Sequence, residues 1–343
     1  MHIQEINLLP PQQFGFRTQH NTVQPLARIH RLVKENYSEN KSTGMILLDV
    51  KAAFDSVWHE GLIHKMMKAR FHCSLTKIIK SFLTNRSFQV HIEDKQSNIF
   101  NLPAGCPQGS VLSPILYNIY THEFPELPSA TSSIFADDTA IISSRILASE
   151  IINNLQTSIE IVTSYFNKWK IKLNSSKTQA IFFTRKRRAV FTPQTQIRME
   201  NVDIPWELNV KYLGVILDSK MTFKAHISYT VDKHNKLVKL LYPFINRKSS
   251  MSLENKMIIV KVIFHAVMFY AAAVWSKTAK CHQNKLLKII HDLPWYFSTA
   301  ELHNITGIEL ITDKIERLTN NFIDKCLNST ITHINSLSVY YLL

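Results

Sequence analysis

The stretch TSSIFADDTAIISS, residues 131–144, consists of two apolar, β-prone runs on either side of Ala136-Asp137-Asp138. Apolar runs of this length around a short turn predict a β-hairpin that carries the two acids at its tip. Both carboxylates would then lie at one rim of a sheet. The alternative is that the Asp-Asp pair only forms the turn, which short acidic side chains commonly do by hydrogen-bonding to nearby backbone.

A third acid stands at the end of another apolar run. GMILLDV, residues 44–50, is typical of a buried strand, and Asp49 follows its apolar part. Two such strands side by side would bring Asp49, Asp137 and Asp138 to one edge of a sheet. Neighbouring carboxylates in an apolar setting repel each other unless a cation compensates, and Mg²⁺ prefers oxygen ligands. Three acids can hold two metals roughly 3.5–4 Å apart for in-line displacement at phosphorus; the alternative for Asp49 is a helix cap.

The composition indicates a globular chain that attracts a polyanion. The 343 residues are 45% hydrophobic, which excludes a disordered chain, and the 7 glycines argue against a Gly-rich all-β scaffold. The formal net charge is +14, and a basic surface attracts nucleic acid because neutralised phosphates release counterions. An anionic membrane surface can exploit the same charge, so the charge alone does not decide the partner.

The cysteines and the first residues predict a protein that is not secreted and belongs to a reducing, intracellular compartment. No CxxC is present, and residues 1–13 lack the basic region and apolar core of a signal peptide. The apolar stretch 257–275 contains Lys261 and His265, so it predicts a core helix and not a membrane span.

Hydrophobic periodicity predicts an α+β fold with a helical region from about residue 224 to the end. Strands are also expected at 179–184 and 211–218, and a pair of strands around a polar turn is expected within residues 87–105. Helical spacing of apolar residues predicts helices in the first two-thirds of the chain at 21–36, 52–71, 74–85, 110–124 and about 148–169.

An ordered series of sequence blocks, from about residue 12 to about residue 325, resembles the reverse transcriptases of non-LTR (LINE-like) retrotransposons. The similarity is strongest to the jockey group of arthropods. A single ADD tripeptide is a weak signal, but this many blocks in order is very specific. The blocks are QFGFRTQHNTVQPLARI (13–29), LLDVKAAFDSVWHEGLI (47–63), LPAGCPQGSVLSPILYNIY (102–120), IFADDTAI (134–141), WKIKLNSSKTQAIFF (169–183), VKYLGVILDSKMTF (210–223), and the later segments AAAVWS, NKLLKII, PWYF and LHNITGIELI.

The resemblance gives the acids unequal roles. It implies that Asp49 and Asp137 are metal ligands, that the Val50 carbonyl is an additional ligand, and that Asp138 supports them. The implied cofactor is a pair of Mg²⁺ ions, with Mn²⁺ as the alternative. The implied reaction is attack of a primer 3′-OH on the α-phosphate of a deoxynucleoside triphosphate, in which two metals serve the attacking and leaving oxygens.

Three further residues fall at substrate positions of the family. Phe54 matches an aromatic steric gate, which would collide with a ribose 2′-OH and so select deoxynucleotides. Its alternative is an ordinary core phenylalanine. Gln108 and Gly109 match a loop that lies along the incoming nucleotide and the template, where a glycine permits close approach. The alternative for both is a plain loop before a helix.

The remaining roles implied by the resemblance concern nucleic acid and the leaving group. Lys177 would protonate the pyrophosphate, and Arg17 would contact template or phosphates. The alternative in both cases is a solvated surface cation. Tyr212, Leu213 and Gly214 match the primer grip, although they can also form an ordinary core strand.

The implied architecture is a right-hand polymerase. Residues 1–44 would form partial fingers, 45–224 a palm with a split β-α-β sheet, and 225–343 a helical thumb. The implied partners are an RNA template, a DNA primer, the dNTPs and an RNA–DNA hybrid read through its backbone shape. No membrane partner is implied, and the sequence does not indicate an oligomeric state.

One departure from the family concerns the start of the chain. Relatives carry a YRPISLL-type block before QFGFR, and only residues 6–10 resemble it. This difference predicts a 5′-truncated copy of a mobile element. Two other functions remain open: a non-catalytic remnant that binds nucleic acid, and a peripheral membrane protein that uses its positive charge and residues 257–275.

Overall fold

The computed structural model describes residues 8–185, 195–275 and 283–342, and the segment 6–10 lies partly outside them. The chain forms two compact units. The first comprises Met1–Pro25 and Val33–Leu208, and the second comprises Leu26–Leu32 and Asn209–Leu343. Helix α2 (Val23–Ser38) contributes to both units. Mixed strands and helices in the first unit and helices in most of the second confirm the predicted α+β class.

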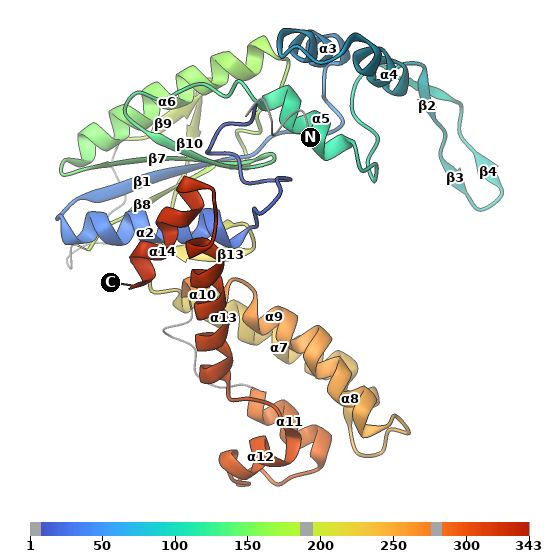
Figure 1. The fold of residues 1–343 in the computed structure, drawn as a ribbon, viewed down its shortest axis with the longest axis vertical. Coiled ribbons are helices and arrows are strands. Elements are labelled where there is room, and N and C mark those ends of the chain that lie inside the picture. Colours follow the sequence, from blue (N-terminus) through green and yellow to red (C-terminus); the bar gives the residue numbers. More distant parts are fainter. Residues whose placement is uncertain (1–7, 186–194, 276–282, 343) are drawn as a thin grey trace. The chain divides into compact units, whose positions relative to one another are not determined.

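A five-stranded sheet forms the centre of the first unit (Figure 1). Its strand order is β11-β8-β1-β7-β6, and β1 lies between two antiparallel neighbours. Met45 and Ile46, consecutive residues that point to opposite faces of the sheet, are both fully buried, which accounts for the continuous apolar sequence of β1. The strands are β1 (Ser42–Leu48), β6 (Thr131–Phe135), β7 (Asp138–Arg145), β8 (Gln179–Phe183) and β11 (Trp206–Glu207).

Helix α6 (Ala148–Lys168) runs along one face of this sheet (Figure 1). Its apolar stripe is buried, as its 3.6-residue periodicity predicts. Gly44 on β1 lets the helix approach closely: a methyl group at this position would lie 2.6 Å from Ile151 Cγ2 and 2.8 Å from Leu155 Cδ1. The hydrophobic core of the first unit therefore lies between α6 and the sheet.

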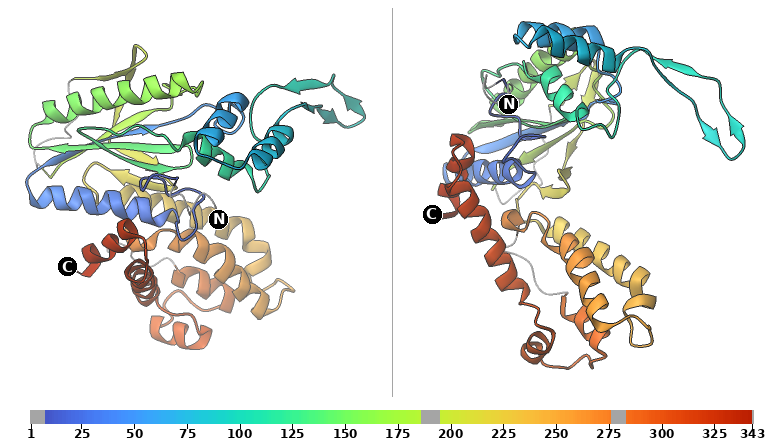
Figure 2. Two further views of the ribbon diagram at one scale, coloured as in Figure 1. Left: turned by 45° about the horizontal axis from the view of Figure 1, so that its top comes forward. Right: turned by 45° about the vertical axis from the view of Figure 1, so that its right-hand side comes forward.

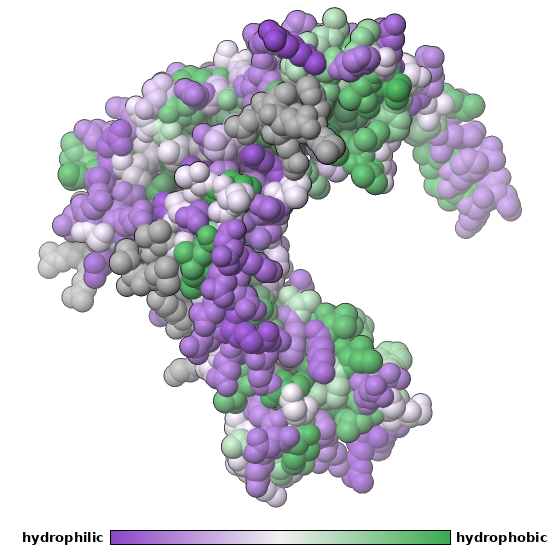
Figure 3. All heavy atoms as spheres, in the orientation of Figure 1, coloured by the Kyte–Doolittle hydropathy of each residue, from purple (hydrophilic) through white to green (hydrophobic). Residues whose placement is uncertain are grey.

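Further helices and small hairpins complete the first unit. A hairpin extends away from α3 and α4 (Figure 2), with a hydrophilic tip and a more hydrophobic base (Figure 3). The elements are α3 (His59–Lys68), α4 (Cys73–Leu83), α5 (Ser113–Thr121), and the paired strands β2 (Arg86–Phe88) with β5 (Phe100–Leu102), β3 (His91–Ile92) with β4 (Lys95–Gln96), and β9 (Ile197–Met199) with β10 (Val202–Ile204).

The helix predicted over 52–71 begins later than expected, because residues 51–56 form turns and α3 starts at His59. The carbonyls that would have started the helix accept hydrogen bonds from a distant loop. Cys106 N donates to Phe54 O at 2.8 Å, and Gly105 N donates to Val57 O at 2.9 Å. These long-range bonds tie the 102–109 segment to the end of β1, which local periodicity could not indicate.

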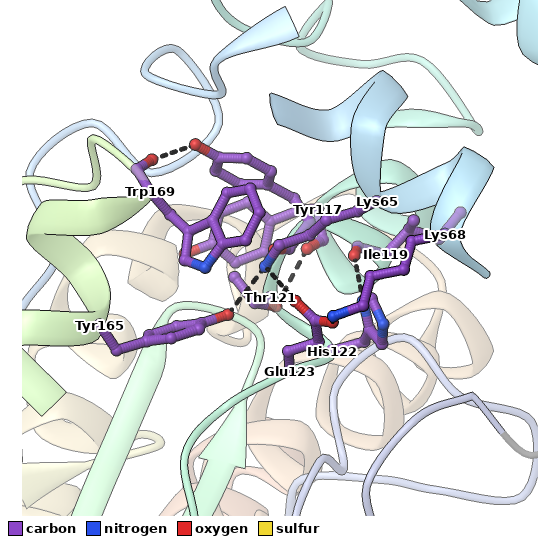
Figure 4. A network of polar contacts seen from close by, with 10 residues as sticks. Lys65, Lys68, Tyr117, Ile119, Thr121, His122, Glu123, Tyr165 and Trp169 are labelled. Atoms are coloured by element: carbon purple, nitrogen blue, oxygen red, sulfur yellow. Dashed lines mark hydrogen bonds and ion pairs between the residues drawn. The ribbon is translucent and has the colours of Figure 1, made fainter. Parts of the chain in front are cut away.

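A buried lysine joins α3, α5 and α6 (Figure 4). Lys65 has no exposed side-chain area, and its Nζ donates to Tyr120 O at 2.5 Å and to Tyr165 Oη at 3.0 Å. The same Nζ lies 3.8 Å from the Trp169 ring centroid and 3.8 Å from a Glu123 carboxylate oxygen. Burial lowers the pKa of Lys65 to about 7, an effect that Glu123 partly offsets.

The second unit contains one hairpin and a series of helices. The predicted strand 211–218 is wrong as a single strand, because Leu213 and Gly214 turn the chain between β12 and β13. The elements are β12 (Asn209–Tyr212), β13 (Val215–Asp218), α7 (Lys224–Ile245), α8 (Leu253–Ile259), the π-helical η1 (Val260–Phe264), α9 (His265–Phe269), α10 (Ala272–Trp275), α11 (Gln283–His291), α12 (Thr299–Thr306), α13 (Ile311–Leu327) and α14 (Thr332–Leu342).

The apolar stretch 257–275 forms several short segments instead of one helix. Ala271 has a φ of 52°, which ends the helical path between α9 and α10. Val260 and Phe264 are buried in the core of the second unit. Within the described residues, no helix combines the length and the apolar character needed to cross a membrane.

Candidate active site

The sheet brings the ends of β1 and β7 to one edge. Leu48 is opposite Thr139 in the antiparallel register, so Asp49, directly after β1, lies at the same edge as Asp138, the first residue of β7. Asp137 belongs to the turn that enters β7. The predicted hairpin over 131–144 is therefore confirmed, and the three acids lie at the same edge of the sheet.

The turn between β6 and β7 is held by a residue from the beginning of the chain. Phe135 pairs with Asp138, which leaves a two-residue turn whose first residue, Ala136, has a φ of 58°. The buried Gln13 side chain accepts hydrogen bonds from Ala136 N at 3.1 Å and Gly15 N at 2.8 Å. Gln13 begins the QFGFR block, but no local pattern indicated that it would fix this turn.

The three carboxylates influence one another electrostatically. Burial and the Asp49 charge raise the pKa of Asp137 above its ordinary value. Burial, Asp137 and Asp49 raise the pKa of Asp138 to about 6, although much of this residue faces solvent. Burial, followed by the charge of Asp137, also raises the pKa of Tyr117. The site therefore concentrates negative charge that a cation would relieve.

Asn174 is the principal support of Asp49. Its Nδ2 donates to Asp49 Oδ2 at 2.8 Å, and its backbone N–H donates to Asp49 O at 2.8 Å. Asn174 is 9% exposed, and its own Oδ1 accepts a bond from Ser176 Oγ at 2.8 Å. Sequence reasoning missed this residue, although it lies in the LNSSKT segment three positions before Lys177.

The donor chemistry at this edge fits a hard divalent cation. Carboxylate oxygens from two adjacent strands are the ligand type that Mg²⁺ takes. Burial, with repulsion from the neighbouring carboxylates in addition, raises the pKa values of Asp137 and Asp138, and a nearby cation would offset both effects. Among the residues that the structure describes, no three His, Cys, Asp or Glu side chains form a group arranged around one metal position. The metal roles of Asp49, Val50, Asp137 and Asp138 therefore stay predictions.

Phe54 lies in a chain of aromatic rings. Its ring centroid is 5.0 Å from that of Tyr117 and 6.3 Å from that of Phe16, and Phe16 is 6.4 Å from Phe135. Phe54 is half-buried. This placement is compatible with both the steric gate and the ordinary core residue, so the gate stays a prediction.

The loop that contains Gln108 and Gly109 contacts the turn after β1. Gln108 Nε2 donates to both carboxylate oxygens of Asp55, at 2.9 and 3.0 Å. Gly109 has a φ of 83°, but a methyl group there would meet no protein atom within 4 Å. Close approach within the protein occurs instead at Gly105, where a methyl group would lie 2.6 Å from Asp55 O. Contact of Gln108 and Gly109 with a nucleotide stays a prediction.

Arg17 and Lys177 have different surroundings. Arg17 Nη1 donates to Pro10 O at 2.9 Å and Gln13 O at 3.2 Å, so part of its guanidinium stabilises the segment that holds the acid turn. Lys177 is exposed in the turn that follows Asn174. Their predicted roles toward template and leaving group remain untested.

The predicted primer-grip residues form the β12–β13 turn of the second unit. Tyr212 is 2% exposed, and Leu213 and Gly214 have φ values of 44° and 81°. The Tyr270 hydroxyl donates to Leu213 O at 2.8 Å, and a methyl group at Gly214 would lie 3.0 Å from the Tyr270 ring. Tyr270 thus fixes the shape of this turn.

A family model and similar curated proteins all point to the same family. The model described as "Reverse transcriptase (RNA-dependent DNA polymerase)" matches residues 1–217. The "RNA-directed DNA polymerase from mobile element jockey" of Drosophila funebris is 32% identical over 345 residues, which cover 96% of this chain and 37% of the relative. The "Probable RNA-directed DNA polymerase from transposon BS" of Drosophila melanogaster is 30% identical over 336 residues, with 94% and 37% covered.

The chain thus spans just over a third of the length of these curated relatives. Among solved structures, it is similar to a telomerase from Candida tropicalis in complex with a TWJ fragment of telomeric RNA. That likeness has 15% identity and a TM-score of 0.45, and it covers 99% of this chain and 55% of the other.

Proposed function

The chain belongs to the reverse transcriptase (RNA-dependent DNA polymerase) family, and we propose that it transfers deoxynucleotides to a primer 3′-hydroxyl on an RNA template. The observation that carries this proposal is the meeting of Asp49, Asp137 and Asp138 at the ends of two neighbouring strands. The raised pKa values of Asp137 and Asp138 support a site that needs positive charge for its work. The relatives of this chain are named as polymerases of mobile elements such as jockey.

We assign the cofactor to two divalent ions, Mg²⁺ with Mn²⁺ as the alternative. Asp49 and Asp137 would hold them, with the Val50 carbonyl as an additional ligand and Asp138 in support. When bound, the ions would activate the primer hydroxyl and stabilise the leaving pyrophosphate. Asn174 orients the Asp49 carboxylate by its side-chain amide.

The aromatic and polar residues beside the acids suit the sugar and base of an incoming nucleotide. Phe54, in contact with Tyr117, would place its ring edge under the sugar and exclude a 2′-OH. Gln108, held by the Asp55 carboxylate, would lie along the nucleotide and the template with Gly109. The nucleotide would thus be selected by shape at the sugar and by pairing with the template at the base.

The nucleic acid itself would be held through charge and backbone shape. The net charge of +14 favours a template–primer hybrid, because each neutralised phosphate releases counterions. Arg17 would contact the template, Lys177 would protonate the leaving pyrophosphate, and the turn at residues 212–214 would meet the primer end. In the terms of the family, residues 1–44, 45–224 and 225–343 would serve as partial fingers, palm and thumb. We place the reaction in the cytoplasm or the nucleus, where RNA templates and dNTPs occur.

Primer extension tests this function directly. Purified protein, an RNA template annealed to a DNA primer, dNTPs and Mg²⁺ should give extended primer, and a chelator should stop the reaction. Extension on the RNA template without added divalent ion would contradict the metal assignment. Binding to the hybrid without any extension would support a non-catalytic nucleic-acid-binding function.

A further inference from the structure

A concave surface lies within the helical second unit, far along the chain from Asp49, Asp137 and Asp138. A pocket of about 840 Å³ opens between the end of α7, helix α11 and the turn that follows α11. The side chains in its lining that matter here are Tyr242, Arg247, Lys248, Lys288, Asp292 and Trp295. Polar and apolar residues are interspersed over this end of the unit (Figure 3).

One aromatic residue of the pocket lining, Trp295, and the residue after it, Tyr296, expose their side chains to water. Trp295 is 86% exposed and Tyr296 is 73% exposed, and their rings meet edge to face at 5.7 Å. By contrast, Trp169, Trp206 and Trp275 are each less than a tenth exposed. Large rings held in water lose the free energy that burial would give, so a stacking partner gains from covering them.

The pocket also carries excess positive charge. Arg247, Lys248 and Lys288 line it, and Asp292 is the acid among its lining residues. Arg247 Nη1 lies 2.9 Å from Asp292 Oδ2, so these two charges offset each other and the excess rests on Lys248 and Lys288. Lys288 Nζ donates to Trp295 O at 2.6 Å, which fixes the turn and places a cation beside the tryptophan.

We propose that this pocket binds single-stranded nucleic acid, with a base stacked on Trp295 and backbone phosphates beside Lys248 and Lys288. Exposed rings interleaved with cations are the two components of sequence-tolerant single-strand binding. A duplex offers its stacked bases to no such ring, so the pocket prefers unpaired strands. The site is independent of catalysis and takes an RNA or DNA segment that is not paired to the primer.

Tryptophan fluorescence reports on this site. Titration with a short single-stranded RNA should quench the emission of the wild-type protein, because Trp295 is the most exposed of the tryptophans named above. Trp295→Ala should weaken binding, measured by fluorescence anisotropy of a labelled strand, by about five- to a hundredfold. Trp295→Phe keeps a ring and should bind within a few-fold of wild type while it loses most of the quenching.

Charge and catalysis are tested separately. Lys248→Ala should reduce the slope of log affinity against log salt by about 0.7, the value for one phosphate contact on a single strand. Asp137→Asn should leave both quenching and anisotropy unchanged, so failure of catalysis and failure of this site are distinguishable. The same titration with a single-stranded DNA of equal length shows whether the 2′-OH contributes to affinity.

Several results would overturn the proposal. Wild-type affinity in Trp295→Ala would remove the stacking contact, and equal competition by a blunt duplex would remove the single-strand preference. Thermal unfolding of each variant checks that it is folded. Because Trp295→Phe preserves the ring, loss of binding in both substitutions would show that the ring is not what holds the strand.

Discussion

At the scale of single residues, Asn174 orients the Asp49 carboxylate, a role that its place in a polar turn does not indicate. Asn174→Ala removes the 2.8 Å bond to Asp49 Oδ2 and frees that carboxylate to rotate. We expect kcat for primer extension to fall by about 10–100-fold, with KM for dNTP nearly unchanged. Ser176→Ala, which loses only the bond to Asn174 Oδ1, is the matched control. A rise in KM with unchanged kcat would contradict a positioning role.

Phe54 allows a test of sugar selection. Phe54→Val shortens the side chain that lies beside Tyr117 and opens space under the sugar. We expect the ratio of kcat/KM for dNTP over rNTP to fall by about tenfold or more, because the selectivity depends on a clash. A ratio is insensitive to any loss of folded protein. If the ratio stays at the wild-type value, Phe54 is a core residue and nothing more.

Lys65 predicts a pH dependence of stability. Its pKa of about 7 in the folded protein lies below its ordinary value of 10.5. Between these values the unfolded chain binds more protons, so the free energy of unfolding rises with pH, by up to about 1.4 kcal/mol per pH unit. Urea unfolding should therefore show a gain of about 2 kcal/mol from pH 7.5 to pH 9, and Lys65→Met should lack most of it. If wild type and Lys65→Met gained the same free energy of unfolding over this pH range, a group other than Lys65 would be releasing the proton.

At the scale of elements, the QFGFR segment packs tightly against the β6–β7 turn. A methyl group at Gly15 would lie 2.4 Å from Ala136 N, which is backbone and cannot move alone. Gly15→Ala should destabilise the fold by about 1–3 kcal/mol and reduce primer extension by displacing Asp137. Gly307→Ala, whose methyl group meets no atom within 4 Å but whose φ of 62° strains an alanine, should lower stability and leave extension unchanged, which separates general destabilisation from displacement of Asp137. Wild-type extension by Gly15→Ala would argue against coupling of the two segments.

Elements whose burial is marked in their own sequence were predicted, and features that depend on distant residues were not. Periodicity predicted β1, the hairpin at 131–144 and helix α6, because each has its apolar face marked in its own sequence. It failed for residues 52–58, where Phe54 O and Val57 O accept bonds from residues about fifty positions away. Gln13 and Asn174 were missed for the same reason, since their partners are distant in sequence. The turn at Gly214 could have been predicted from the sequence, because glycine adopts positive φ without steric cost.

At the scale of the whole molecule, the acids belong to the first compact unit, and the primer-grip turn and the Trp295 pocket belong to the second. Sequence blocks indicated the order of these parts, but no local pattern indicated that the boundary falls at residues 208–209. In the proposed function, the three carboxylates at one edge of the sheet in the first unit perform nucleotide transfer. Binding of nucleic acid draws on the basic charge of the whole chain.

Primer extension by Asp137→Asn on an RNA template tests the assignment of this sheet edge as the active site most directly. The affinity of the same protein for the template–primer hybrid is measured alongside it. Asparagine keeps the size of the side chain and removes the charge that a cation requires. We expect extension to fall by at least about a thousandfold, in line with loss of an essential catalytic group, while hybrid affinity stays within a few-fold of wild type. Extension at the wild-type rate by Asp137→Asn would contradict the assignment of this edge as the active site.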